Sequence, residues 1–213
     1  MKEIYFVTGI DTDAGKSIAT GYLARQLMQS GKRVITQKLI QTGNTSMSED
    51  IEVHRKMMGT GLLPEDVEHI TCPFIFTHPC SPHLAAQIDQ REININRINE
   101  CTRILSDKYD VVLIEGAGGV MVPIKEDYLT IDFMEQQNYP VILVTSSKLG
   151  SLNHTLLTLE ACKNRGLQIK SIIYNEFPIA DPIIAADSYQ YLERYIKENK
   201  MDTTLQRMPI LDL

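Results

Sequence analysis

The chain has 213 residues, 43% of them hydrophobic, and a formal net charge of −6, so it can bury a sizeable core but shows no basic footprint for nucleic acid or an anionic membrane. No apolar run approaches the ~20 residues that span a bilayer, and the sequence enters a strand-like segment directly, without the apolar core of a signal peptide. We therefore expect one domain over residues 1–213, located in the cytoplasm, with neither nucleic acid nor a membrane as partner.

The first predicted unit is a strand, a glycine-containing loop and a helix. The apolar run at 4–7 predicts a buried strand, and the residues at 20, 23, 24, 27 and 28 predict one face of an amphipathic helix. Between them lies GIDTDAGKS, from Gly9 to Ser17, in the context that a phosphate-binding loop requires. Backbone N–H groups would surround the β-phosphate, Lys16 would reach the β and γ oxygens, and Ser17 would bind Mg²⁺. The nucleotide contacts expected from this segment are Asp13, Ala14, Gly15, Lys16, Ser17 and Ile18.

The glycine spacing of this loop is unusual. Five residues separate Gly9 from Gly15, one more than in the common G-x-x-x-x-G-K pattern. A chance Gly-Lys-Ser at a helix start is the alternative. The strand before the loop and the helix after it favour the phosphate-binding interpretation.

The rest of the chain alternates predicted strands and helices. A polar loop at 41–49 and an irregular segment at 60–82 interrupt the alternation, and Asp50 opens a helical stretch that ends at Gly59. Further strands are predicted at 34–40, 111–114, 141–145 and 169–174, and further helices at 83–90, 94–106, 130–137, 151–164 and 182–199. This alternation predicts an α/β fold with a doubly wound, mostly parallel sheet and helices on both faces, similar to the P-loop NTPases.

Such a sheet binds ligands beyond the carboxyl ends of its strands. Those ends carry Lys38, Glu115, the segment 145–153 and Asn175. Glu115 and Asp50 could supply carboxylates to Mg²⁺, and Lys38 could place a second cation on a transferred phosphoryl group. We therefore expect a site for phosphoryl transfer at this edge of the sheet.

Each of these residues also has an ordinary structural explanation. Lys38 could be a solvated charge and Asp50 a helix N-cap, whereas Glu115 closes a strongly apolar strand before a glycine-rich stretch and needs a partner. The helix start at Ser151 is either a simple serine cap or an anion site. Asn175 follows a strand where a purine could lie, and the absence of the Asn-Lys-x-Asp of GTP-selective proteins there favours adenine.

The four cysteines, at 72, 80, 101 and 162, have no C-x-x-C spacing, and no histidine belongs to an H-E-x-x-H motif. We expect reduced, structural thiols rather than disulfides or a zinc site.

Several separated motifs together resemble the dethiobiotin synthetase family, and the resemblance runs over nearly the whole chain. They are GIDTDAGKS with its longer glycine spacing, QKLIQTG at 37–43, SPHLAA at 81–86, EGAGG at 115–119 and LGSLNH at 149–154. Leu39 departs from the family pattern, in which proline is usual, and Gln37 stands where an aromatic residue is frequent.

The resemblance implies an enzyme that uses ATP and Mg²⁺ to carboxylate 7,8-diaminopelargonate with CO₂ and to close dethiobiotin through a carbamate and a carbamic-phosphoric mixed anhydride. It implies catalytic roles for Thr12, Lys16 and Lys38, a Mg²⁺ site at Ser17, Asp50 and Glu115, and further nucleotide contacts at Glu115, Asn175 and Pro209. The implied substrate contacts are Thr12, Lys38, Thr42 and Gly118 and, from the neighbouring subunit of a homodimer, Gly150, Ser151, Leu152 and Asn153.

Two other classes share this broad fold. Partitioning-type switch ATPases usually carry an additional lysine early in the loop, which residues 9–14 lack, and no basic amphipathic membrane helix is expected at 198–213. Cobyrinate-type amide-forming synthetases usually add a glutamine-hydrolysing domain, for which 213 residues leave no room. The motifs favour the synthetase of dethiobiotin over both.

Overall fold

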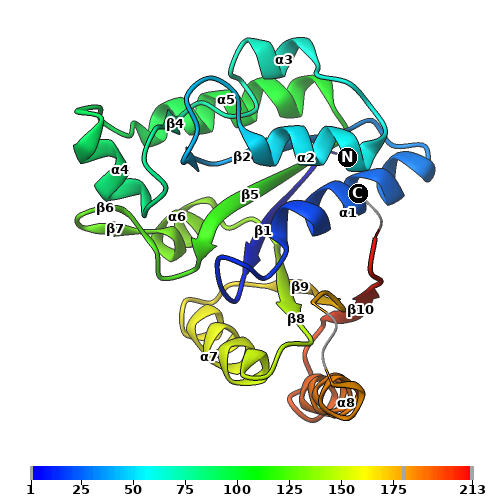
Figure 1. Cartoon of the computed structure of the whole chain (residues 1–213). Coiled ribbons are helices and arrows are strands. Elements are labelled where there is room, and N and C mark those ends of the chain that lie inside the picture. The colour runs from blue at the N-terminus through cyan, green and yellow to red at the C-terminus, as the bar shows by residue number, and fades with distance from the viewer. Residues whose placement is uncertain (1, 179–180, 212–213) are drawn as a thin grey trace.

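The computed structural model describes residues 2–178 and 181–211. Its centre is a six-stranded sheet in the order β10-β9-β8-β1-β5-β2, in which every neighbouring pair of strands is parallel (Figure 1). These strands are β1 (Glu3–Gly9), β2 (Val34–Lys38), β5 (Val111–Gly119), β8 (Val141–Ser146), β9 (Ile169–Asn175) and β10 (Thr204–Met208).

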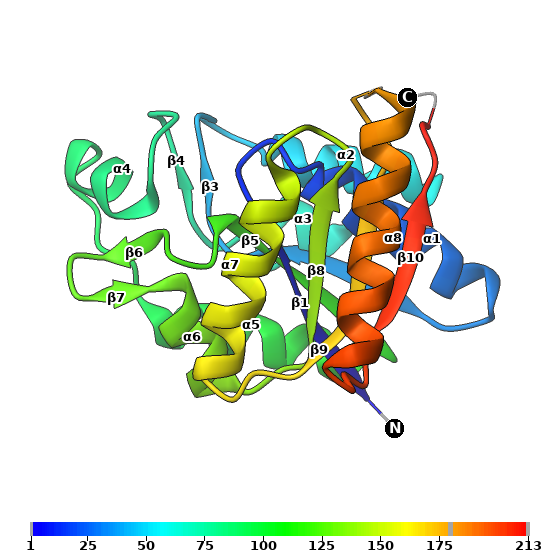
Figure 2. The same cartoon turned by 90° about the horizontal axis from the view of Figure 1, so that it is seen from below.

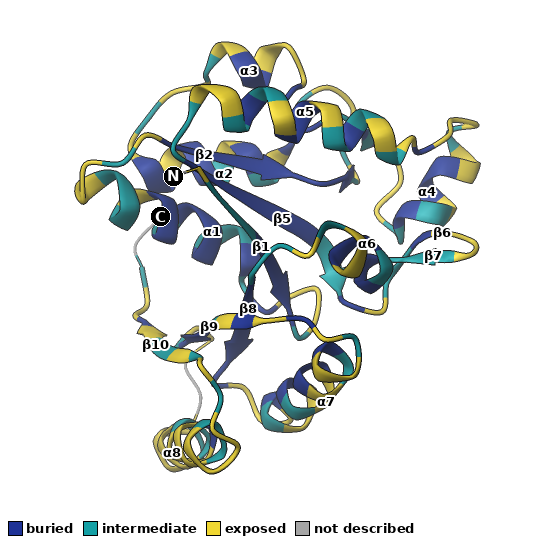
Figure 3. Cartoon of the chain, turned by 180° about the vertical axis from the view of Figure 1, so that it is seen from behind, coloured by how far each residue is buried: buried dark blue, intermediate teal, exposed yellow. Residues whose placement is uncertain are grey.

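Helices cover both faces of this sheet, and their outer surfaces are exposed while the strands are mostly buried, apart from the edge strand β10 (Figure 3). Side chains alternate along a strand, so that in β5 Val111 and Leu113 pack with one layer of helices and Val112 and Ile114 pack with the other. The first layer is α1 (Lys16–Gln29) and α2 (Glu49–Met58), and the second is α5 (Ile95–Lys108), α6 (Thr130–Gln137), α7 (Ser151–Asn164) and α8 (Pro182–Glu198). The predicted doubly wound α/β fold is confirmed.

The same alternation decides where the functional candidates on the strands point. Lys38 and Glu115 pair in register on the neighbouring strands β2 and β5. Glu115 lies two residues after Leu113, which packs with α1 and α2. Both side chains therefore extend towards α1 and α2 at the carboxyl edge of the sheet.

The start of α2 differs from one expectation. Ser48, not Asp50, is the N-cap, because its hydroxyl accepts the N–H of Ile51 at 3.2 Å. The same hydroxyl donates to the side-chain oxygen of Gln41 at 2.6 Å. Asp50 is the second residue of α2. Its carboxylate does not cap the helix and is available for other contacts.

Several short elements were not expected. The segment at 60–82 contains α3 (Pro64–Val67) and β4 (Ile75–Phe76), and β4 pairs with β3 (Gln41–Thr42). A hairpin of β6 (Pro123–Lys125) and β7 (Tyr128–Leu129) follows β5. The strands β3, β4, β6 and β7 and the helix α4 (Pro82–Ile88) lie at the end of the molecule opposite α8 and β10 (Figure 2).

Strand boundaries also differ from the prediction, for physical reasons. The strand expected at 34–40 ends at Lys38, because the chain then turns away and pairs with β4 through Gln41. The strand expected at 111–114 continues to Gly119, which pairs with Gly9. Strand β10 has polar residues on both faces and lies at the sheet edge, so its sequence carries no clear apolar alternation.

None of the helices that the structure describes is long and apolar enough to cross a membrane. All four cysteines are free thiols. Burial raises the pKa of Cys72 and of Cys162 to about 12, which makes these two thiols unreactive parts of the core.

Candidate active site

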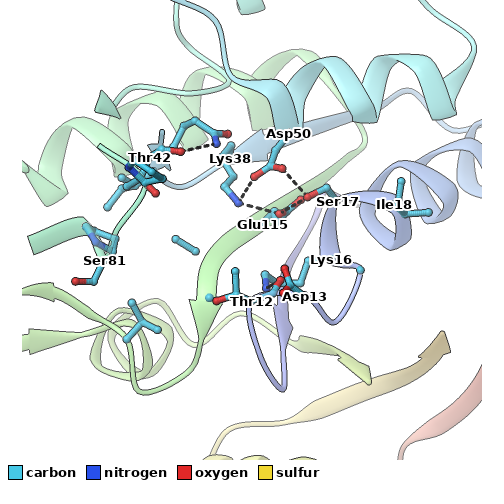
Figure 4. Close-up of a pocket in the computed structure, with 18 of the residues that line it drawn as sticks. Thr12, Asp13, Lys16, Ser17, Ile18, Lys38, Thr42, Asp50, Ser81 and Glu115 are labelled. Carbon is cyan, nitrogen blue, oxygen red and sulfur yellow. Dashed lines mark hydrogen bonds and ion pairs between the residues drawn. The ribbon is translucent and has the colours of Figure 1, made fainter. Parts of the chain in front are cut away.

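A cavity of about 900 Å³ opens at the carboxyl edge of the sheet, within the size range of small-molecule sites. Most of the residues singled out from the sequence face it from different elements (Figure 4). They are Thr12, Asp13, Gly15, Lys16, Ser17, Ile18, Lys38, Thr42, Asp50, Glu115, Gly118, Asn175 and Pro209.

Lys16 opens α1 and lies over the loop that precedes the helix. Its ammonium donates to the carbonyl oxygens of Asp11, at 2.8 Å, and Thr12, at 3.1 Å. Burial lowers the pKa of Lys16 to about 8, although the charge of Glu115 acts in the opposite direction. An anion beside the ammonium would favour its charged form, so the loop is suited to a phosphate.

Two glycines make the loop geometry possible. Gly15 has φ +87°, and a Cβ there would meet the side-chain nitrogen of Asn175 at 2.3 Å. At Gly9 a Cβ would lie 2.9 Å from the side chain of Lys16. The first glycine of the unusual spacing thus leaves room for the lysine stem.

Asn175 holds this loop in place. Its amide nitrogen donates to the carbonyl of Ala14 at 3.1 Å, and its amide oxygen accepts the N–H of Phe177 at 3.0 Å. Ala14, which belongs to the same loop, is buried and does not line the cavity. Asn175 therefore has a structural role in addition to the base contact predicted for it, and that contact stays a prediction.

Ser17, Lys38, Asp50 and Glu115 form one polar cluster on the cavity wall (Figure 4). The Ser17 hydroxyl lies 2.7 Å from Oδ1 of Asp50 and 3.0 Å from Oε1 of Glu115. The Lys38 ammonium lies 2.8 Å from the same Oε1 and 2.5 Å from Oδ2 of Asp50. It also donates to the carbonyl of Gly116 at 3.2 Å. Lys38 is thus not the solvated charge of the alternative explanation.

The charges in this cluster depend on one another. Burial alone would raise the pKa of Glu115, but the ammonium of Lys38 and the hydrogen bond from His54 hold it well below the usual range. Burial alone would lower the pKa of Lys38, but Glu115 and Asp50 raise it above its ordinary value. The cluster therefore contains a charged lysine and an ionised carboxylate below the protein surface.

The donor set of this cluster fits Mg²⁺. The residues that the structure describes contain no group of three or more His, Cys, Asp or Glu side chains arranged for a metal. Ser17, Asp50 and Glu115 offer one hydroxyl and two carboxylates, and the hydroxyl lies within hydrogen-bond distance of both carboxylates. Mg²⁺ is usually held by one or two carboxylates together with substrate phosphates and water, so this set suits a metal that is shared with a nucleotide.

Thr12 and Gly118 lie close together, since a Cβ at Gly118 would be 3.8 Å from the Thr12 hydroxyl. Thr42, in β3, lines the same cavity from the side of β4 and α4. Thr12, Thr42 and Gly118, which come from the loop, from β3 and from the glycine-rich end of β5, therefore line the same cavity.

The other predicted substrate contacts lie elsewhere. Gly150 has φ +95° and precedes α7, and Ser151, Leu152 and Asn153 form the first turn of that helix. None of them lines the cavity, and Asn153 is exposed. The Ser151 hydroxyl forms a hydrogen bond of 2.8 Å with Ser146.

Two polar residues of this region escaped the sequence prediction. His54 is fully buried, and its ring nitrogens lie 2.6 Å from Oε2 of Glu115 and 3.0 Å from the Thr36 hydroxyl. His54 follows Asp50 by four residues on α2, and Thr36 precedes Lys38 by two on β2. Helical and strand periodicity place each on the same face as a predicted site residue, which is the signal that could have found them.

A sequence model of the family described as an AAA domain matches residues 3–210. Among the similar curated proteins, the ATP-dependent dethiobiotin synthetase BioD 2 of Pasteurella multocida is 48% identical over 213 residues, which is all of both chains. BioD 2 of Haemophilus influenzae is 52% identical over 86% of this chain and 96% of its own. BioD of Chlorobaculum tepidum is 43% identical over 99% of this chain and 87% of its own.

A solved structure of pNOB8 ParA bound to nonspecific DNA has a TM-score of 0.59 at 13% identity and covers 100% of this chain and 86% of its own. This likeness concerns the fold alone.

Proposed function

Because the chain belongs to the ATP-dependent dethiobiotin synthetase family, a family of ligases, we propose that it carboxylates 7,8-diaminopelargonate with CO₂ and closes the product to dethiobiotin. ATP is the second substrate, and ADP and phosphate leave.

The reaction proceeds in three steps. One amine of the diamine adds to CO₂ and loses a proton, which gives a carbamate. A carbamate oxygen attacks the γ-phosphorus of ATP, the bond to ADP breaks, and a carbamic-phosphoric mixed anhydride forms. The second amine attacks the carbonyl carbon, phosphate leaves, and the cyclic urea is closed.

The loop residues bind and orient the nucleotide. Backbone N–H groups of residues 13–18 surround the β-phosphate, with Lys16 on the β and γ oxygens. Asn175 and Pro209, which line the cavity beyond this loop, frame the base. Ser17, Asp50 and Glu115 would hold Mg²⁺. The metal would neutralise the negative charge that develops on the transferred phosphoryl group.

Lys38 stabilises negative charge on the phosphoryl group during its transfer. Its ammonium lies at the wall of the cavity that Lys16 also lines, so the two cations can approach the carbamate and the γ-phosphate together. Fixed positive charge aimed at a developing anion lowers the barrier to reaction. Thr12, Thr42 and the backbone at Gly118 contact the carbamate or the diamine.

The tail carboxylate of the substrate requires a second site. The start of α7, at Gly150, Ser151, Leu152 and Asn153, offers the backbone N–H groups of a first helical turn and the positive end of a helix dipole. It lies outside the cavity of its own chain. We assign it to the cavity of a second copy, so the working unit is a homodimer.

The placement of Lys38 supports this function most. A lysine held against Asp50 and Glu115, on the wall of the cavity that contains the phosphate loop, supplies the fixed positive charge that a transfer from nucleotide to carbamate requires.

The test is an incubation of the purified protein with 7,8-diaminopelargonate, bicarbonate, Mg²⁺ and ATP, with mass detection of dethiobiotin and an assay of phosphate. We expect dethiobiotin and phosphate in equal amounts, and only with the diamine present. Phosphate released without the diamine, and without dethiobiotin, would instead favour a partitioning-type switch ATPase.

A further inference from the structure

The two oxygens of the Glu115 carboxylate have different partners. Oε1 lies 2.8 Å from the Lys38 ammonium and 3.0 Å from the Ser17 hydroxyl, on the cavity side. Oε2 lies 2.6 Å from Nε2 of His54. Both side chains of the Glu115–His54 contact are fully buried, so water does not compete for it.

The second nitrogen of His54 is engaged as well. Nδ1 lies 3.0 Å from the Thr36 hydroxyl, and that hydroxyl accepts a hydrogen bond from Nη1 of Arg55 at 2.8 Å. A hydroxyl that accepts from Arg55 still has its own proton to donate. The ionised Oε2 of Glu115 can only accept. The arrangement in which every group is satisfied therefore has the proton on Nε2, donated to Glu115, and Nδ1 accepting from Thr36.

Helix α2 links this contact to the other carboxylate of the cluster. His54 lies four residues after Asp50 on α2, so the two side chains share one face of the helix. Asp50 reaches Ser17 and Lys38, and His54 reaches Glu115. One rigid element thus places one carboxylate directly and orients the other.

We propose that His54 is a positioning residue, which holds Oε2 of Glu115 through its Nε2–H and leaves only Oε1 to the nucleotide-bound metal. This inference rests on the proposed role of Glu115 as a Mg²⁺ ligand. It assigns to Glu115 a one-oxygen contact with the metal, because rotation of the carboxylate would break the buried hydrogen bond to His54.

Three variants separate positioning from packing. In His54→Gln the side-chain amide reaches far enough to replace Nε2–H, whereas in His54→Asn the shorter amide reaches only towards Thr36, and His54→Leu removes both contacts. The measurement is the Kd of ADP by calorimetry, with Mg²⁺ and with EDTA. Partners of this kind typically change metal affinity by about 10- to 100-fold.

We expect His54→Asn and His54→Leu to raise the Kd measured with Mg²⁺ about tenfold, with the Kd in EDTA unchanged and His54→Gln close to the wild type. Equal behaviour of the Gln and Asn variants would overturn the proposal, and so would a loss of the same size in EDTA. A wild-type Kd that does not depend on Mg²⁺ would remove the proposed metal site and this inference with it.

A second measurement needs no substitution. Nitrogen-15 NMR of the histidine rings in the wild-type protein distinguishes a proton on Nε2 from one on Nδ1. We expect the Nε2–H form at His54, with its ring proton protected from exchange with water. An Nδ1–H ring would contradict the assigned hydrogen bonds.

Discussion

Lys38 is 4% exposed, which is unusual for a lysine. The structure compensates its burial with two carboxylates and a carbonyl oxygen. An isolated buried charge is costly, and a buried ion pair adds little to stability compared with well-packed apolar groups. We therefore propose that the cluster serves the chemistry of the site rather than the stability of the fold.

Lys38→Met should lower turnover by about 10²-fold or more, in line with the loss of one preorganised transition-state donor. Lys56 is an exposed lysine of α2, and Lys56→Met is the matched control, with an expected change in stability of under ~0.5 kcal/mol and little change in turnover. Steady-state kinetics and thermal unfolding are measured together. Near-normal turnover in a folded Lys38→Met variant would contradict the role.

Two glycines flank α1 and differ in how much space surrounds them. Gly15 and Gly31 both have φ +87°, but a Cβ at Gly15 would meet Asn175 at 2.3 Å, whereas nothing lies within 4 Å of one at Gly31. Gly31→Ala should therefore cost only about 1–2 kcal/mol of backbone strain and leave nucleotide affinity unchanged.

Gly15→Ala should cost more in unfolding free energy than Gly31→Ala, because the new methyl group also displaces Asn175 from the loop. It should also raise the Kd of the nucleotide. Urea unfolding and calorimetric titration of ADP measure the two effects, and equal losses in the two variants would show that crowding by Asn175 is unimportant.

Helix α2 is joined to the segment at 60–82 by a buried ion pair. Nη2 of Arg55 lies 2.7 Å from Oδ1 of Asp66, and both side chains are at most 2% exposed. Asp66 also accepts from the N–H of Leu63 and the hydroxyl of Thr71. The irregular segment at 60–82, for which the sequence predicted no role, thus has a structural one. It anchors α2, the helix that carries Asp50.

Arg55→Met should lower the unfolding free energy by about 3–5 kcal/mol, since it leaves Asp66 buried without its cation. Arg97 forms an exposed pair with Glu100, and Arg97→Met should cost no more than about 1 kcal/mol. Urea unfolding measures both. A similar small loss in the two variants would mean that the buried pair does not anchor the segment.

The sequence predicted long, periodic elements better than short ones. The helices at 130–137 and 151–164 have the predicted bounds, since each has a regular pattern and a clear stop. The two-residue strand β4 and the edge strand β10 have no periodicity to detect, and their pairing partners are distant in the sequence.

The site was predictable where chain order and fold rules suffice. Residues at carboxyl strand ends, such as Lys38 and Glu115, were found because parallel strands end at one edge. The pairing of Asn175 with Ala14 and of His54 with Glu115 was not, because each joins positions that only the packed structure brings together.

At the scale of the whole molecule, the cavity and the start of α7 are separate on one chain. If a second copy supplies the binding site for the tail carboxylate, two different inactive variants should complement each other. Mixing inactive Lys16→Met and Asn153→Glu proteins, the second with a carboxylate that repels the substrate tail, should restore some activity, because one site of each mixed dimer combines intact residues from both chains. Activity is measured after subunit exchange, with each variant alone as control, and no recovery would count against a shared site.

The contact of Lys38 with Asp50 and Glu115 also affects how strongly these carboxylates can bind a free metal ion. The ammonium is tethered beside these oxygens, so its effective concentration there is far higher than that of any dissolved ion. A divalent cation that binds without a nucleotide must displace the Lys38 ammonium, which then has no new anion to pair with. A cation that arrives with a nucleotide brings phosphates with which the lysine can pair instead, so we expect the lysine to favour binding of the metal–nucleotide complex over the bare ion.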